Sequence, residues 1–251
     1  MIKEVTSVNN SYIKWLLTLK DKQVRKEHSL FIVEGYHLVE ESLKHNVLKA
    51  VLCTEKEVLD NINVEEKYLV NEQIIKKISS TKSPQNIIGV VSSITNHDLK
   101  NIISKKEVRI LILDDINDPG NLGTIIRTSA ALGIDAVISS NETVDYYNEK
   151  VLRATQGAIF KIPLFKGDLV KIISTLKQND ITIYGTCLDS SVSVKEVEKF
   201  KKLAIVVGNE AQGVSSKVLA LCDKNIILPM KNDVESLNVS IAAALLMWEL
   251  K

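Results

Sequence analysis

The chain has 251 residues, 45% of them hydrophobic, which is enough apolar sequence to bury one large core or two modest ones. Its 32 basic and 31 acidic residues nearly cancel, so a polyanionic partner would have to be bound by a local basic patch and not by the overall field. Cys53, Cys187 and Cys222 lie far apart without metal-ligand spacing, and no apolar run reaches the roughly 18 residues of a membrane helix. We therefore expect a cytoplasmic protein with no metal site, no disulfide framework and no membrane partner.

The first part of the chain predicts a small α/β domain. Residues 1–106 carry 16 basic and 13 acidic side chains, a net charge of +3, whereas residues 107–251 carry 16 and 18, a net charge of −2. Lys14, Lys22, Arg25 and Lys26 make the opening of the chain basic and are candidate RNA contacts. The pattern of apolar and polar residues predicts helices over 7–21, 36–44 and 71–78, and strands over 31–33, 48–53 and 86–92. We predict a first domain over 1–94 and a polar, lysine-rich linker over 95–107.

The second predicted domain, residues 108–251, alternates strands with helices. Its first strand is an almost uninterrupted run of β-branched residues and leucine, as expected for a strand that is covered on both faces of a parallel sheet. Strands are predicted over 108–113, 136–139, 181–187, 203–207 and 225–228, and helices over 122–132 and 238–250. This alternation favours an α/β fold with a parallel sheet.

Arginines are rare in this chain and are therefore informative. Only Arg25, Arg109, Arg127 and Arg153 occur among the 32 basic residues, so lysine is the usual surface cation here. A guanidinium matches a phosphate with two parallel hydrogen bonds, which makes Arg127 and Arg153 candidates for holding a nucleic-acid phosphate. An exposed helix residue and an ordinary helix end are the alternatives. Asn121 lies after a turn signal and is predicted to cap the helix that carries Arg127.

Two further segments indicate a ligand site. Gly208-Asn209-Glu210, with Gly213 nearby, follows an apolar strand, and ligands of open α/β sheets gather at the carboxyl ends of strands. Leu228-Pro229-Met230 ends another strand, and Ser236-Leu237-Asn238 is predicted to cap the last helix. Neither the phosphate-binding loop nor the dinucleotide-binding glycine pattern is present, which argues against a nucleotide-triphosphate or NAD enzyme.

Together these segments resemble the SpoU/TrmH family of RNA 2′-O-ribose methyltransferases, within the SPOUT class. N-x-G-x-x-x-R occurs as Asn121, Gly123 and Arg127, and G-N-E-x-x-G begins at Gly208. I-x-P-M followed by S-L-N-V-S-x-A occurs from Ile227 to Ala242, and R-A-[ST]-x-G-A begins at Arg153. The first domain is more loosely similar to the family's substrate-binding module, an α/β unit akin to small ribosomal RNA-binding proteins.

The resemblance implies S-adenosylmethionine as cofactor, a deep trefoil knot in the last third of the second domain, and a homodimer. Its implied target is a guanosine of 23S ribosomal RNA, with transfer RNA as an alternative and no DNA. Cofactor contacts implied for this chain are Thr186, Gly208, Asn209, Glu210, Leu228, Met230 and Leu237. Arg127 matches the family's catalytic arginine, which is sometimes described as a base; because a guanidinium stays protonated in proteins, we expect it to hold a phosphate and stabilise the developing alkoxide.

The remaining implied roles concern orientation and RNA recognition. Asn121, Ser236 and Asn238 would orient the ribose or Arg127, and Glu210 would shape the cofactor pocket. Tyr12, Trp15 and Tyr36 are candidates for stacking on unpaired bases, although burial is the favoured interpretation. The rival function is a non-catalytic RNA-binding or ribosome-assembly protein with the same fold, which the presence of all four candidate catalytic residues disfavours.

Overall fold

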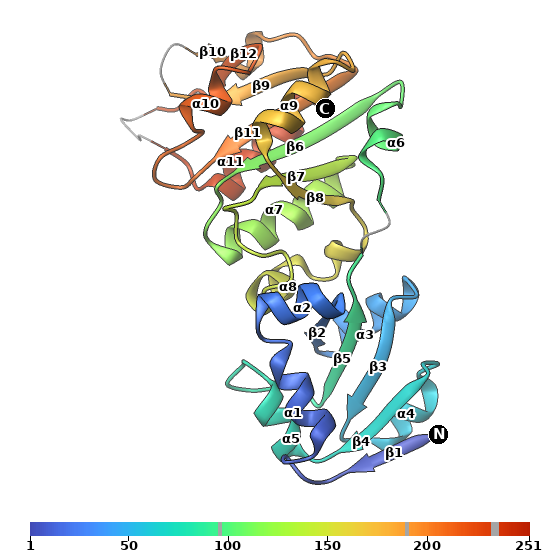
Figure 1. The fold of residues 1–251 in the computed structure, drawn as a ribbon. Helices are drawn as coiled ribbons and strands as arrows, with labels where there is room; N and C mark the ends of the chain where they lie inside the picture. Colours follow the sequence, from blue (N-terminus) through green and yellow to red (C-terminus); the bar gives the residue numbers. More distant parts are fainter. Residues whose placement is uncertain (95–96, 189–190, 232–235) are drawn as a thin grey trace. The chain divides into compact units, whose positions relative to one another are not determined.

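The computed structural model describes residues 1–94, 97–188, 191–231 and 236–251, which form two compact units. The first unit contains the described residues up to 94 together with 147–160. The second contains the remaining described residues, 97–146 and those from 161 onward (Figure 1).

A five-stranded mixed sheet is the centre of the first unit (Figure 1). Its elements are β1 (Ile2–Val5), α1 (Ser11–Thr18), α2 (Lys22–His28), β2 (Leu30–Glu34), α3 (Tyr36–Lys44), β3 (Leu48–Cys53), α4 (Lys56–Asn61), β4 (Glu66–Val70), α5 (Glu72–Ile78), β5 (Ile87–Ser92), α8 (Glu149–Thr155) and the 3-10 turn η1 (Ala158–Phe160). The strand order is β1-β4-β3-β5-β2, and only β5 runs antiparallel to its neighbours. The predicted strands are confirmed, but the sequence pattern missed β1, α4 and β4, and the single predicted helix over 7–21 ends early, with α2 following as a separate helix.

The second unit is built on a seven-stranded sheet. Its elements are α6 (Leu99–Ile103), β6 (Val108–Asp114), α7 (Pro119–Leu132), β7 (Ala136–Ser140), β8 (Leu164–Gly167), α9 (Leu169–Lys177), β9 (Thr182–Thr186), β10 (Val192–Ser193), the 3-10 turn η2 (Val194–Glu196), β11 (Lys202–Gly208), α10 (Ser216–Leu219), β12 (Lys224–Ile227) and α11 (Val239–Glu249). The strand order is β10-β12-β9-β11-β6-β7-β8, and every pair is parallel, which confirms the predicted parallel sheet.

Both faces of this sheet are covered, as the apolar strand sequences require. Alternate residues of the central strands, such as Ile110 and Val206, pack with apolar residues of α6, α9 and α10 in one core. The strand residues between them are also buried, and α11 packs against both β11 and α7. No helix in the described residues is both long enough and apolar enough to cross a membrane.

Helix α7 begins earlier than the sequence predicted. Asp118, not Asn121, is its N-cap, and the Asp118 carboxylate accepts a hydrogen bond of 2.8 Å from the backbone amide of Asn121. Pro119 follows in the first turn, where the absence of an N–H costs nothing. The prediction that Asn121 caps the helix was therefore wrong. Its side chain is available for another contact.

One segment lies in a different unit from the domain that was predicted to contain it. Residues 147–160 were predicted to belong to the second domain but pack within the first unit, where the Tyr147 ring stacks on Phe31 at 4.4 Å between ring centroids. The predicted linker starts at residues 95 and 96, which lie outside the described residues. Its later part contains α6, whose Ile102 and Ile103 are buried in the core of the second unit.

Candidate functional site

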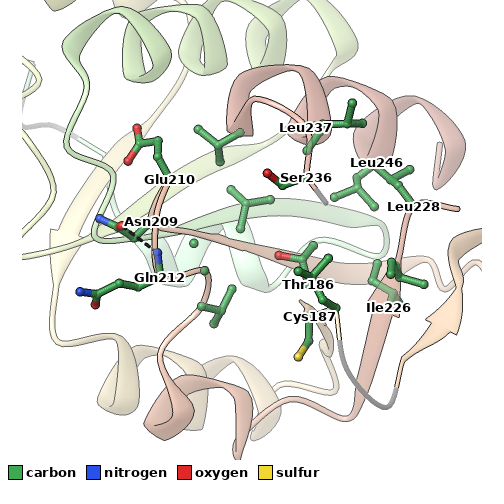
Figure 2. A pocket seen from close by; sticks show the side chains of 18 of the residues that line it. Thr186, Cys187, Asn209, Glu210, Gln212, Ile226, Leu228, Ser236, Leu237 and Leu246 are labelled. Carbon is green, nitrogen blue, oxygen red and sulfur yellow. Dashed lines mark hydrogen bonds between the residues drawn. The ribbon is translucent and has the colours of Figure 1, made fainter. Parts of the chain in front are cut away.

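Three neighbouring strands of the second sheet end at one edge, and the segments that follow them enclose a cavity. Strand β9 lies between β12 and β11, so the segments after Thr186, Gly208 and Ile227 emerge close together. The cavity has a volume of about 430 Å³, within the range of small-molecule sites, and Ser236 and residues of α11 also line it (Figure 2). All seven residues predicted to contact the cofactor line this one cavity: Thr186, Gly208, Asn209, Glu210, Leu228, Met230 and Leu237.

The loop from Gly208 to Gly213 is folded tightly on itself. Asn209 and Gly213 exchange two backbone hydrogen bonds of 3.0 and 2.9 Å, and the Asn209 side-chain oxygen accepts from the amides of Ala211 and Gln212 (Figure 2). A Cβ atom on Gly208 would lie 2.1 Å from backbone atoms of Gly213 and Val214. Gly213 has a φ of 70°, which favours glycine. Gly208 was predicted to let a ligand approach the backbone; the structure shows that it lets the loop approach itself.

The Glu210 carboxylate lies at the amino end of α7. Oε1 accepts from the Asp118 amide at 3.3 Å and from Asn121 Nδ2 at 3.0 Å, and Oε2 accepts from the Asn117 amide at 3.4 Å. Burial alone would raise the pKa of Glu210, but these hydrogen bonds favour the charged form, and the pKa is lowered overall. A negative charge is also favourable at a helix N-terminus. Glu210 therefore fastens the cavity loop to α7.

Asn121 continues this connection to the last helix. Its Oδ1 accepts from Asn238 Nδ2 at 2.9 Å, while its own Nδ2 donates to Glu210. Asn238 is the N-cap of α11, as predicted, and its Oδ1 accepts from the Ser240 amide at 2.9 Å and from the Ser240 hydroxyl at 2.6 Å. The partners of Asn121 and Asn238 therefore fix which side-chain atom of each is the oxygen and which is the nitrogen. The chain of hydrogen bonds ties the cavity loop to the starts of both α7 and α11.

The cavity walls suit a ligand that is part apolar and part polar. Leu228, Leu237 and Leu246 contribute apolar side chains, and the Gly208–Gly213 loop contributes polar ones (Figure 2). The Thr186 hydroxyl donates to the Val206 carbonyl at 3.0 Å, which fixes this side chain at the end of β9. Pockets of this composition, with few polar groups among apolar walls, are typical of cofactor sites.

Comparison with known proteins identifies the family. Residues 108–248 match the model of the SpoU rRNA methylase family, and residues 10–89 match that of the MRM3-like substrate binding domain. The chain belongs to the SpoU rRNA methylase family. Membership confirms the predicted enzyme class, a methyltransferase that acts on RNA.

Several relatives extend over the whole chain. The 23S rRNA (guanosine(2553)-2′-O)-methyltransferase RlmP of Bacillus subtilis strain 168 is 34% identical over 254 residues, which cover 100% of both chains. An AdoMet-bound rRNA methyltransferase from Sinorhizobium meliloti has a TM-score of 0.89 at 28% identity, with 99% of this chain and 97% of that chain covered. The SpoU methyltransferase AviRb from Streptomyces viridochromogenes shares the fold, with a TM-score of 0.87 at 22% identity and 96% and 97% coverage.

The arginine that matches the family's catalytic residue lies outside the cavity. Arg127 is exposed on α7 and forms no hydrogen bond or ion pair with any other described residue. It lies six residues beyond Asn121, about 9 Å further along the helix axis. The structure thus brings Asn121 and Asn238 together and places Ser236 at the cavity, whereas Arg127 lies further along α7 and is not among the residues that line the cavity.

The candidate RNA contacts separate into two groups. Lys14, Lys22 and Lys26 are exposed on α1 and α2. Arg25 is only 8% exposed, and its Nη1 donates to the carbonyls of Leu19 and Lys20 at 2.9 and 2.7 Å, beyond the end of α1. We therefore assign Arg25 a structural role in place of the predicted RNA contact. Arg153 packs in the first unit and donates to the Ser80 hydroxyl at 2.9 Å.

Sequence reasoning missed one polar contact that supports the site. The buried Asp114 carboxylate, at the end of β6, accepts from both the amide and the hydroxyl of Ser215, at 2.8 and 2.6 Å. Ser215 directly follows the cavity residue Val214, so Asp114 anchors the far end of the Gly208–Gly213 loop. An aspartate that directly follows the apolar run Ile110–Leu113 was the signal in the sequence.

Proposed function

We propose that this member of the SpoU rRNA methylase family transfers the methyl group of S-adenosylmethionine to a ribose 2′-hydroxyl of structured RNA, with a guanosine of 23S ribosomal RNA as the target. The convergence of the three loops on one cavity is the observation that supports the cofactor. Identity of 34% over the full length with RlmP, and the match to a substrate binding domain, support the RNA target. Ribosomal RNA as substrate also supports the expected location in the cytoplasm, with no role for DNA.

In this reaction the cofactor supplies an already activated methyl group, so the protein has to place the ribose hydroxyl and assist the loss of its proton. Arg127 has an exposed guanidinium without an ion partner in the described residues, which suits it to hold a substrate phosphate and stabilise the developing alkoxide. Asn121 and Asn238, held in one orientation by Glu210 and Ser240, and Ser236 at the cavity would orient the ribose.

We also infer a homodimer formed through α11. Ile241, Leu245 and Trp248 are 53%, 45% and 65% exposed, and their spacing of four and three residues places them on one side of the helix. A continuous apolar stripe of this kind marks a protein interface more often than a solvated surface. The family resemblance further implies a trefoil knot, a proposal supported by the adjacency of β9, β11 and β12.

The decisive experiment is methyl transfer with purified protein. The full chain is incubated with labelled S-adenosylmethionine and either naked 23S RNA or ribosomal particles, and the RNA is digested to nucleosides. We expect label in 2′-O-methylguanosine at one site, and no label when Arg127→Ala replaces the wild type. Label on a base, or absence of label with both substrates, would contradict the proposal.

A further inference from the structure

Two loops at one end of the first unit are joined by side-chain hydrogen bonds. The hydroxyls of Ser79 and Thr81, in the loop after α5, both donate to the Glu34 carboxylate at 2.8 Å. In the same loop, Gln85 Oε1 accepts from the Tyr36 amide at 3.0 Å, across a turn in which Gly35 has a φ of 102°. The loop of residues 79–86 is therefore held in place against the β2–α3 turn.

A guanidinium is attached to the same loop. Arg153 of α8 donates to the Ser80 hydroxyl at 2.9 Å, and this bond occupies one of the five N–H donors of the arginine. Arg153 also lines a small hollow together with Glu34 and Ser79, which confirms that α8 and the loop are in contact. Lys82 lies two residues beyond Ser80 and is exposed. Lys82 of the loop and Arg153 of α8 thus place two cations along the same loop.

Tyr36 contributes an aromatic ring from the β2–α3 turn, whose backbone this loop contacts through Gln85. Tyr36 is 41% exposed, and its hydroxyl donates to Glu55 at 2.9 Å, so the ring is held at its far end while much of its surface remains accessible. Burial of the hydroxyl and this hydrogen bond raise the pKa of Tyr36 to about 12, so the ring stays neutral. The other two candidate stacking residues differ. Tyr12 and Trp15 pack against the core of the first unit, and Tyr12 stacks on Tyr68 at 4.4 Å.

We propose that Tyr36, Lys82, Gln85 and Arg153 form the surface that binds an unpaired nucleotide of the RNA, with its base on the Tyr36 ring and its phosphates at Arg153 and Lys82. Stacking on an aromatic ring combined with bidentate phosphate contacts is how proteins bind single-stranded RNA segments. The proposal rests on the proposed RNA substrate. It moves the main RNA contact of the first unit away from α1 and α2, where Arg25 is already engaged by carbonyl groups.

Fluorescence anisotropy with a labelled single-stranded loop fragment of 23S RNA tests this surface in the full chain. Because stacking contributes about 1 to 3 kcal/mol per base, Tyr36→Leu should raise the Kd about tenfold, while Tyr36→Phe stays near wild type. Arg153→Gln and Lys82→Ala should weaken binding and make it less sensitive to salt. The control is the triple variant Lys14→Ala, Lys22→Ala, Lys26→Ala, which removes more charge and should bind nearly as well as wild type.

The outcomes distinguish failure of the proposed RNA-binding surface from failure of the proposed methyl-transfer reaction. Weaker binding by the lysine triple variant than by Tyr36→Leu overturns the proposal, as does a wild-type protein that does not bind the fragment. Unchanged S-adenosylmethionine affinity and urea midpoint in Tyr36→Leu show that the variant is folded. Weakened RNA binding in Tyr36→Leu, combined with no methyl transfer by the wild type, would support the surface and refute the proposed reaction.

Discussion

Replacing Gly208 by alanine tests whether the tight cavity loop is required for cofactor binding. The added Cβ atom would lie 2.1 Å from Gly213 C and Val214 N, and 2.3 Å from Gly213 O. Ordinary van der Waals contact begins at 3.4 Å, so the two backbone segments would have to separate by about 1.3 Å. Since both neighbours are main chain, no side-chain rotation can relieve the overlap.

The loss of stability in Gly208→Ala can be worked out from the interactions that this backbone separation would break. The two hydrogen bonds between Asn209 and Gly213 would be lost, at about 0.5 to 1.5 kcal/mol each, and overpacking adds about 1 to 3 kcal/mol. We expect Gly208→Ala to lower the free energy of unfolding by about 2 to 6 kcal/mol in urea titrations. Titration calorimetry should show S-adenosylmethionine affinity reduced by at least about a hundredfold, because Gly208 and the displaced loop line the cavity.

Gly133→Ala is the matched control. Gly133 ends α7 with a φ of 77°, and a Cβ atom there would meet nothing within 4 Å, so only backbone strain of about 1 to 2 kcal/mol is added. Its stability should fall slightly while cofactor affinity stays unchanged. If Gly208→Ala bound S-adenosylmethionine as tightly as Gly133→Ala, the tight Gly208–Gly213 loop would not be required for cofactor binding, and the assignment of the cofactor to this cavity would be refuted.

Other changes address the remaining parts of the site. Arg127→Ala should lower kcat at least about a hundredfold in the methyl-transfer assay without changing the affinity for S-adenosylmethionine. If kcat and cofactor affinity fell by the same factor, Arg127 would belong to the cofactor site instead. Because folding lowers the pKa of Glu210, its contribution to stability is complete above pH 4.5 and is lost as the pH falls through the folded-state pKa. Urea titrations of wild type and Glu210→Gln should therefore differ at pH 7, by about 1 kcal/mol or less for this exposed group, and this difference should shrink as the pH falls below 4.5; a constant difference would contradict the charge argument. If the proposed homodimer forms through α11, Leu245→Glu should sediment as a monomer and the wild type as a dimer; a dimer that persists in the variant would place the interface elsewhere. Arg25→Lys should cost about 1 to 3 kcal/mol of stability in thermal or urea unfolding and leave RNA affinity unchanged; weaker RNA binding with unchanged stability would restore Arg25 as an RNA contact.

The sequence predicted the cavity well because the rule behind it is simple. Residues that follow parallel strands must appear at one edge of the sheet, so the motifs beginning at Gly208 and Ile227 could be placed together without coordinates. Which of these strand ends are neighbours depends on the order of the strands in the sheet. Nothing in the linear sequence shows that β9 lies between β12 and β11, or that Asn121 pairs with Asn238 across 117 positions.

The errors arose where one residue type has several roles. Asn121 follows a turn and is a good helix cap, yet Asp118 lies three residues earlier and caps the helix, which leaves the Asn121 amide for Glu210 and Asn238. The rarity of arginine was a sound signal, but it does not distinguish phosphate contacts from carbonyl contacts. Arg25 and Arg127 differ in burial, and burial depends on packing that local sequence does not specify.

The side-chain amides of Asn121 and Asn238 can form their hydrogen bonds in only one orientation each. Asn238 can donate through Nδ2 only if its Oδ1 faces Ser240, and Asn121 can accept that bond only if its own Nδ2 faces Glu210. A glutamate that stays ionised enforces this order because a carboxylate cannot donate. The hydrogen-bonding state of Glu210 in the cavity loop therefore determines which atoms Asn121 and Asn238 present at the starts of α7 and α11. The conformation of the Gly208–Gly213 loop therefore shapes the cavity and, through Glu210, orients the side-chain amides beside it.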